Sequence, residues 1–562
     1  MMRLILVAAV FLMSWRWYGW LAAPPQIETC SLYLRALLGL LPIALAMLLA
    51  GPALNGRIWA HAAVAAGMIM ALPVAPYPHS PDMAFHLGKV LWASQHMYVI
   101  DPAMGISTSY PWLFHAVWGE LARLTHSEPI HLLRIASLLN VAGIIGVAAI
   151  FARRWEPPDG QRWLPWLCCL PLIAKDTSYI LLATPSTLSI PIAIAGWWGI
   201  ALARASRGAI QSSIALLAAA VLWPGHIFAM AGVAAVFILR RPREPRTHVL
   251  TLATVVALAI IMLLRFAATG SFATTGAAHW HPTWGPAHIL VVLRHVLSLG
   301  GDANGGIVAA ACTLLTLLLV GLAVLGWRQA RAEERFNFLP GIVGGLLLGT
   351  AGAVWFMVQP AFWSRLASLA GFALVPFAAL GIRRLQHVQF LRASFVLQMG
   401  RVALGSVWLV PFLAAYLVNA DRAAAWPRVY GPVTTALESV AHPLDRVWAT
   451  PETMTQVVMG RMPVFGFLGH QWAGYYAAPA EEADSISNVY HELSQIETPL
   501  IDTYHELRSH GVAFVVLSRI ELDQMPLGRT LQSETHPIWQ DANYSIFSVN
   551  GMHADVESPP AP

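Results

Sequence analysis

The stretch "PYPHSPDMAFHLGKV", residues 76–90, follows a long apolar run and decides how the N-terminal half of the chain folds. It places Asp82 together with His79, His86 and Lys89 at a membrane boundary. The Ser-Pro-Asp sequence is typical of a helix start, which makes Asp82 a candidate N-cap of the helix that follows. Its carboxylate is also a candidate catalytic group, and one residue can fill both roles. The stretch therefore predicts a chain that leaves the membrane and turns into a helix at its surface.

The composition places most of the chain in lipid. The 562 residues are 57% hydrophobic and only 11% charged, whereas a soluble domain is about 25% charged. Apolar runs of about 18 residues or more are candidate spanning helices, and they predict a polytopic α-helical membrane protein with roughly thirteen spans. The expected spans are 3–22, 33–50, 58–75, 130–152, 163–174, 187–203, 210–222, 225–239, 249–268, 305–327, 338–358, 366–382 and 398–419. The sequence leaves open whether the first span is a cleaved signal peptide.

The positive charges indicate orientation rather than nucleic-acid binding. The net charge of +5 comes from Lys and Arg in short loops such as "RRPREPR" at 240–246, and such loops are typically cytoplasmic. Spans 210–222 and 225–239 are then expected to form a hairpin that turns at "WPGH". The other side receives loop 76–129, this turn, and everything after about residue 420. No phosphate-binding Walker loop occurs, which argues against a nucleotide-driven mechanism.

The C-terminal part differs in composition from the apolar region at 1–420. Residues 421–552 are expected to form a small extracytoplasmic α/β domain, and 553–562 a disordered tail. "VAFVVL" at 512–517 and "YSIFSV" at 544–549 are typical of buried strands. Gly511 ends "HELRSHG" and is the expected cap of a helix.

Loop 76–129 contains two segments with helical spacing, 84–97 and 111–124, which suit helices lying in the membrane interface. His79, His86 and His115 are candidate ligands for phosphate or sugar hydroxyls, although a lone histidine is more often a structural hydrogen-bonding residue.

Other polar residues of the outer loops are further candidates. Asp101 is a candidate substrate ligand or the cap of a turn before Pro102. Lys175 and Asp176 would be costly inside the membrane, so they are better placed in an outer loop that touches substrate.

Several of these features together resemble the GT-C superfamily, whose members are multi-spanning glycosyltransferases that use polyprenyl-phosphate-linked sugars. They are the acid shortly before Phe-His in the first outer loop, the "YPWLFH" segment, the Arg365 of "FWSRLASLAGFALVPFAAL" and the outer C-terminal domain. The pattern is especially similar to bacterial enzymes of cell-envelope polysaccharide assembly, including arabinofuranosyltransferases. By this resemblance Asp82 corresponds to the catalytic aspartate and Arg365 to the residue that holds the lipid phosphate.

The resemblance implies an inverting transferase in the inner or plasma membrane, with its site outside the cytoplasm. Asp82 would be the general base, and Arg365, Lys175 and His226 would bind the donor phosphate. The acceptor is a glycan, a lipid or a protein, and the sequence names neither it nor the sugar. Many family members have paired acids in this loop. Here Asp82 stands between Pro81 and Met83, so a divalent metal stays open and no other cofactor is implied.

Two other readings of the sequence remain open. A transporter or flippase of lipid-linked sugars would share the many spans, but would more naturally show internal repeats, and none is clear here. A non-catalytic envelope-assembly protein would use Asp82 only as a helix cap.

Overall fold

The computed structural model describes the chain in segments that fall into two compact units. The described residues are 86–87, 89–90, 93–94, 100–101, 106–107, 112–155, 184–203, 206–269, 317–328, 338–356, 360–386, 431–442, 445–449, 464–465, 500–509 and 511–549. The first unit comprises Met1–Pro76, Arg134–Ile261 and Trp280–Asp421. The second comprises Tyr77–Leu133, Met262–His279 and Arg422–Pro562.

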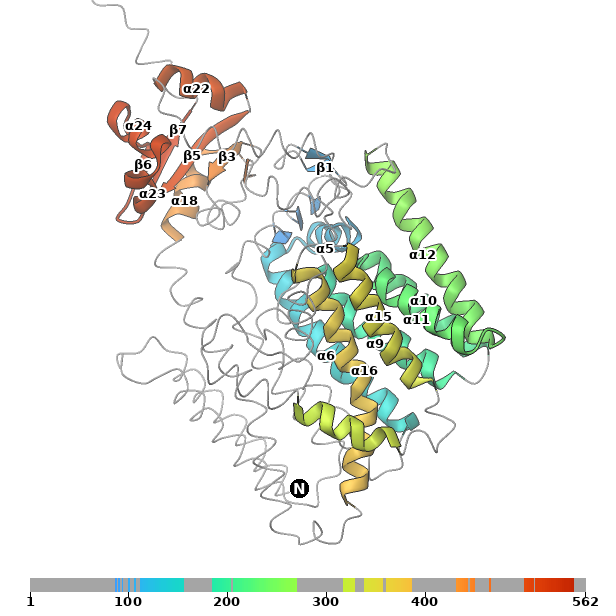
Figure 1. The fold of residues 1–562 in the computed structure, drawn as a ribbon. Coiled ribbons are helices and arrows are strands. Elements are labelled where there is room, and N and C mark those ends of the chain that lie inside the picture. Colours follow the sequence, from blue (N-terminus) through green and yellow to red (C-terminus); the bar gives the residue numbers. More distant parts are fainter. Residues whose placement is uncertain are drawn as a thin grey trace, which may run out of the picture. The chain divides into compact units, whose positions relative to one another are not determined.

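Long apolar helices dominate the described part of the first unit (Figure 1). Helix α5 (Trp112–Thr125) belongs to the second unit. The other labelled helices before residue 400 are α6 (Pro129–Trp155), α9 (Pro185–Leu202), α10 (Ser206–Leu222), α11 (His226–Arg240), α12 (Pro245–Thr269), α15 (Leu339–Phe356) and α16 (Pro360–Gln386). A shorter apolar helix covers Leu317–Arg328. Two of the described helices are long and apolar enough to cross a membrane, Pro185–Leu202 and Pro245–Leu263.

These helices confirm the predicted apolar segments wherever the structure describes them. Helix α11 differs from the predicted 225–239 by one residue at each end, and the hairpin between α10 and α11 turns at "WPGH" as expected. Helix α16 begins six residues before the predicted 366, because Pro360 is a good first helical residue. The expected spans 3–22, 33–50, 58–75, 163–174 and 398–419 lie outside the described residues.

Helices α11 and α15 pack through three glycines. A Cβ added at Gly345 would lie 2.7 Å from the Val233 nitrogen, and one added at Gly232 would lie 2.5 Å from the Gly349 nitrogen. A Cβ at Gly349 would lie 2.8 Å from the Phe228 carbonyl carbon. No real side chain tolerates such distances to a backbone, so only glycine allows this approach. Small residues at four-residue spacing are the usual means by which membrane helices come close.

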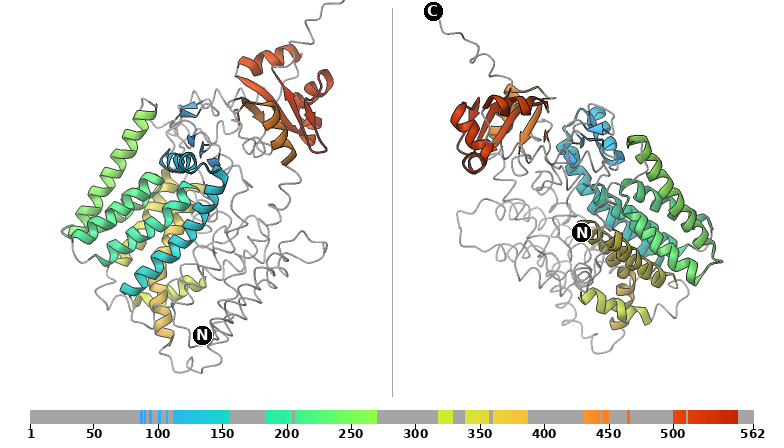
Figure 2. Two further views of the ribbon diagram at one scale, coloured as in Figure 1. Left: turned by 180° about the vertical axis from the view of Figure 1, so that it is seen from behind. Right: turned by 45° about the horizontal axis from the view of Figure 1, so that its top comes forward.

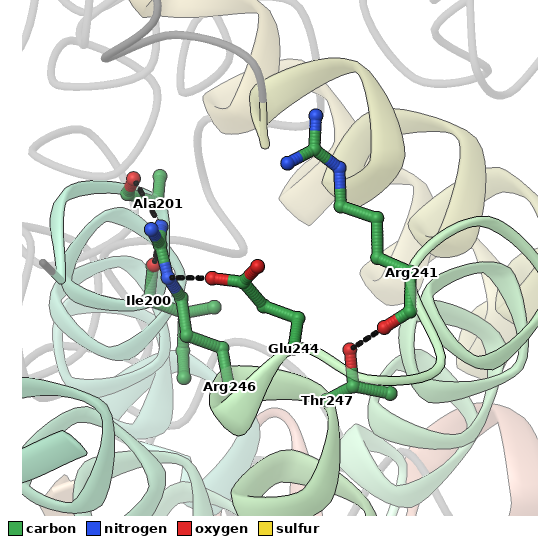
Figure 3. Close-up of polar contacts among 6 residues, drawn as sticks. All are labelled: Ile200, Ala201, Arg241, Glu244, Arg246 and Thr247. Carbon is green, nitrogen blue, oxygen red and sulfur yellow. Dashed lines mark hydrogen bonds and ion pairs between the residues drawn. The ribbon is translucent and has the colours of Figure 1, made fainter. Parts of the chain in front are cut away.

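Arg246 of α12 forms hydrogen bonds with the C-terminal end of α9 (Figure 3). Its guanidinium donates hydrogen bonds to the carbonyl oxygens of Ile200 at 3.4 Å and Ala201 at 3.2 Å. The last carbonyls of a helix lack partners within it and carry partial negative charge, so an arginine there is stabilising. Arg246 also lies 3.6 Å above the ring of Phe338, directly before α15. The C-terminal end of α9 and the N-terminal ends of α12 and α15 therefore meet at one end of the bundle.

The C-terminal part of the second unit is a five-stranded mixed sheet with helices packed on it. The strands are β3 (Arg446–Ala449), β4 (Val464–Phe465), β5 (Val512–Ser518), β6 (Trp539–Gln540) and β7 (Tyr544–Ser548), and the helices are α18 (Gly431–Val440), α22 (Leu500–Ser509), α23 (Arg519–Gln524) and α24 (Pro526–Glu534). The strand order is β4-β3-β5-β7-β6; β3 runs parallel to both neighbours, and β7 runs antiparallel to β5 and β6. Figure 2 shows this red and orange sheet from two further sides.

The predicted strands of this sheet are confirmed. "VAFVVL" forms β5, whose six apolar residues are all buried, and "YSIFSV" forms β7 beside it. Gly511 precedes β5 with a φ of 70°, a left-handed conformation that glycine adopts without strain. The small α/β character expected of this region is therefore correct, while residues 553–562 lie outside the described residues.

The segment 76–129 contains helices at both expected places. Helix α5 covers residues 112–124 of the predicted 111–124, and residues 86, 87, 89, 90, 93 and 94 of the predicted 84–97 are helical. A Cβ added at Gly119 of α5 would lie 2.7 Å from the backbone of Ala93, so the two segments pack closely. A short hairpin that the sequence did not indicate pairs β1 (Ile100–Asp101) with β2 (Ile106–Ser107).

Candidate functional site

Three helix N-termini lie at the end of the first unit opposite Arg246. Because Arg246 and Phe338 join the C-terminal end of α9 to the start of α15, α9 begins and α15 finishes at the other end. Helix α16 starts only four residues after α15 ends, so Arg365, in its second turn, belongs to that end. His226 opens α11 there and contacts Ser189 in the second turn of α9. We call this the hydroxyl end of the bundle.

The name comes from a buried set of hydroxyl groups at the start of α9. The set comprises Thr184, Ser186, Thr187 and Ser189, all below 5% exposure. Thr184 is the N-cap: its oxygen accepts a hydrogen bond from the Thr187 nitrogen, and the Thr187 hydroxyl accepts one from the Thr184 nitrogen. This reciprocal pair is a capping box, and Pro185 at the first helical position strengthens the start.

A buried polar contact holds His226 beside the start of α9. The Ser189 hydroxyl lies 2.8 Å from the Ser186 carbonyl oxygen, and His226 Nε2 lies 2.7 Å from the same hydroxyl. The Nδ1 atom of His226 is buried and has no hydrogen-bond partner among the described residues.

The turn before α11 holds this imidazole in place. The Trp223 ring packs edge-on against His226, with ring centres 5.1 Å apart and an angle of 87°. A Cβ added at Gly225 would overlap the Trp223 ring. Gly225 is thus needed for space, because its φ of −54° suits any residue. The "WPGH" sequence builds a covered histidine at a helix start.

A second histidine arrangement lies within segment 76–129. His86 Nδ1 and His115 Nε2 are 3.0 Å apart, both rings are buried, and they stack at an angle of 20°. One nitrogen must donate and the other accept, so at least one imidazole is neutral. Phe114 packs edge-on against both rings, and Lys89 is also buried. The pair joins α5 to the preceding helical segment, which is the structural role weighed for these histidines from the sequence.

The remaining candidates are placed only in part. Arg365 in α16 and Asp101 in β1 are described by their backbone alone. Asp101 pairs with Ile106 in the short hairpin. Asp82, His79, Lys175 and Asp176 lie outside the described residues, so the expected approach of Asp82 to Arg365 stays a prediction. No group of three His, Cys, Asp or Glu side chains that could hold a metal occurs in the described segments.

Sequence reasoning missed the hydroxyl set. The signal that could have found it is "ATPSTLS", where Thr-Pro marks a helix start and three further hydroxyl residues follow within one and a half turns. Judged by composition alone, the segment belongs to an ordinary apolar span.

No protein-family model matches the sequence, and no curated protein matches it either. Solved structures do match. The chain has the fold of the GT-C membrane glycosyltransferases, as the sequence resemblance indicated. The structure of ArnT from Cupriavidus metallidurans bound to undecaprenyl phosphate matches with a TM-score of 0.57 at 13% identity, over 88% of this chain and 98% of that one. Its apo form matches with a TM-score of 0.57 at 14% identity, over 88% and 97%.

A weaker match is the oligosaccharyltransferase AglB from Archaeoglobus fulgidus in complex with an inhibitory peptide and a dolichol-phosphate. It has a TM-score of 0.48 at 10% identity, over 83% of this chain and 70% of that one. At these identities the comparisons establish the fold alone.

Proposed function

We propose that this protein is an inverting glycosyltransferase of the cell inner or plasma membrane. It would move a sugar from a polyprenyl-phosphate donor to an extracytoplasmic acceptor during cell-envelope glycan assembly. The observation that supports the proposal is the contact of His226 with the start of α9, at the end of the bundle where α16 begins, in a fold similar to that of a protein bound to undecaprenyl phosphate. Glycan, lipid and protein acceptors all fit this chemistry.

The proposed reaction needs a base and a clamp for the leaving phosphate. Asp82 takes the proton of the acceptor hydroxyl while its oxygen attacks the anomeric carbon. The bond between that carbon and the phosphate oxygen breaks, its electron pair leaves with the phosphate, and the anomeric configuration inverts. Arg365 holds the departing phosphate, since a guanidinium matches phosphate oxygens with two parallel hydrogen bonds. The proton on Asp82 then returns to solvent.

His226 and Lys175 would complete the donor site. Lys175 precedes the N-cap Thr184 by nine residues in the sequence. His226 is already held through Nε2 by Ser189, so Nδ1 is the atom left for a ligand. An imidazole that carries its proton on Nδ1 donates it to a phosphate oxygen.

The test is a transfer assay on protein reconstituted in nanodiscs, with a panel of undecaprenyl-phosphate sugars and release of undecaprenyl phosphate as the signal. We expect Asp82→Asn to reduce release at least ~10²-fold, the lower end for removal of a general base. Arg365→Gln should also reduce release, whereas Arg123→Gln should not, because Arg123 is exposed and pairs with Glu120 on the surface of α5.

Two results would refute the proposal. An Asp82→Asn protein with ordinary release would leave the enzyme without its base. Movement of the intact lipid-linked sugar between leaflets, with no release of undecaprenyl phosphate from any donor, would identify a flippase instead.

A further inference from the structure

The end of the first unit opposite the hydroxyl end carries a set of exposed arginines. Arg207 lies in the first turn of α10, Arg240 ends α11, and Arg241 and Arg243 lie in the turn that leads to α12. We call these four residues the arginine face. They share one end because the α10 start follows α9 closely and the turn before α12 is tied to the last turn of α9.

The fold fixes the turn that presents these charges (Figure 3). Arg246 binds the carbonyls at the end of α9, and the Thr247 hydroxyl donates to the Arg241 carbonyl at 2.9 Å. The Arg241 guanidinium lies 4.6 Å from the ring centre of Phe338, on the exposed side of the turn. Pro242 and Pro245 further restrict the backbone. The arginines are thus held by a rigid turn.

Among the described residues 184–203 and 206–269, which include the arginine face, Glu244 is the one acid. That carboxylate lies 3.3 Å from the Arg246 guanidinium, which holds it within the turn. Figure 3 shows the Arg241 guanidinium apart from it. Within the described residues 184–203 and 206–269, this end of the bundle therefore carries an excess of positive charge.

The surface beside the arginines is apolar. Leu239 is 83% exposed immediately before Arg240, and Leu252 and Val255 of α12 are 65% and 58% exposed. A ligand for this region needs an anionic group for the guanidinium forks and hydrocarbon for the neighbouring leucines. An anionic phospholipid has both, with its phosphate at the end of its acyl chains. Free phosphate would leave the apolar side unmatched.

We infer that the arginine face binds the headgroups of anionic phospholipids, whose acyl chains lie along the exposed apolar sides of α11 and α12. The binding anchors this end of the bundle in a leaflet of negative charge. It does not depend on the proposed transfer reaction. A basic residue at such a surface contributes roughly a five-fold increase in lipid affinity, so two arginines together give about a 25-fold preference for an anionic over a zwitterionic lipid.

The test is native mass spectrometry of the full-length protein in detergent with equal amounts of dioleoylphosphatidylglycerol and dioleoylphosphatidylcholine. The wild type should retain phosphatidylglycerol preferentially. In the double variant Arg241→Gln/Arg243→Gln, the ratio of bound phosphatidylglycerol to bound phosphatidylcholine should fall about 25-fold. The matched double variant Arg123→Gln/Arg529→Gln removes the same charge from exposed positions in the second unit and should keep the preference.

Three outcomes would overturn the inference. Equal preference in the two double variants would show that the arginine face does not bind the lipid. Displacement of phosphatidylglycerol by millimolar inorganic phosphate would indicate a site for the free anion. Displacement by a poly-glutamate peptide at lower concentration would indicate an acidic protein partner. Helix content and melting temperature of both variants, measured beforehand, show whether each is folded.

Discussion

Replacing Gly349 by Ala should separate α11 from α15 at the hydroxyl end of the bundle. The new Cβ would lie 2.8 Å from the Phe228 carbonyl carbon and 3.0 Å from the Ala229 Cα. Carbon atoms in contact normally lie about 3.5–4.0 Å apart. Both neighbours are backbone atoms, so no side-chain rotation can relieve the overlap, and the helices must move apart by roughly 1 Å.

Gly344, on the same helix, provides the matched control. A Cβ added there has nothing within 4 Å, and the residue is exposed. Both substitutions gain the same helix propensity, about 1 kcal/mol for Ala over Gly, and this gain cancels in the comparison. Overpacking a close contact costs about 1–3 kcal/mol. Gly349→Ala should therefore be less stable than Gly344→Ala by about that amount.

The assay is reversible unfolding in mixed micelles with increasing sodium dodecyl sulfate, followed by tryptophan fluorescence. Donor binding measured on the same samples adds a functional reading. Phe228 and Ala229 follow His226 by two and three residues, so the displaced turn of α11 should weaken donor binding in Gly349→Ala and leave Gly344→Ala unchanged. Equal free energies of unfolding for the two variants would refute the close packing of α11 and α15.

Three further predictions concern the C-terminal sheet, and hydrogen exchange of β5 in the full-length protein measures each. Gly511→Ala should destabilise the sheet by about 1–2 kcal/mol, because an alanine is strained at a φ of 70°; unchanged exchange would contradict this. The Ser518 hydroxyl accepts a hydrogen bond from the Glu521 nitrogen, and the Glu521 carboxylate accepts one from the Ser518 nitrogen at 2.6 Å. Ser518→Ala should therefore lower the stability of the sheet by about 1 kcal/mol. Equal protection of β5 in the variant and the wild type would exclude this helix cap. Burial raises the pKa of Tyr504, so the folded state holds the tyrosine proton more tightly than the unfolded state does. The protection of β5 amides from exchange should therefore fall as pH rises above about 10. Tyr504→Phe should lose this pH dependence, and a dependence that persists in the variant would assign it to another group.

The positions of the described helices before residue 400 and of β5 and β7 could be predicted from the sequence because each is set by a local property. Apolar runs long enough for a bilayer predict helices, and "VAFVVL" and "YSIFSV" are apolar runs of strand length. The same reasoning failed for β3, whose short "RVWA" segment carries no local strand signal. That strand exists because it pairs with β5 in parallel, across more than sixty residues of chain.

For the candidate site too, the sequence indicated single residues, and the tertiary structure supplied the contacts between them. Sequence alone identified His226 as a candidate and placed it at a turn, but it could not supply the contact with Ser189. Those residues are 37 apart in the chain, and His86 and His115 are 29 apart. Arg246 reaches α9 carbonyls 45 and 46 residues away. Hydrophobicity and charge bias are sums over neighbouring residues, so the sequence alone determined a helical membrane protein with a small α/β region. A hydrogen bond between helices depends on their packing, which only the tertiary structure decides.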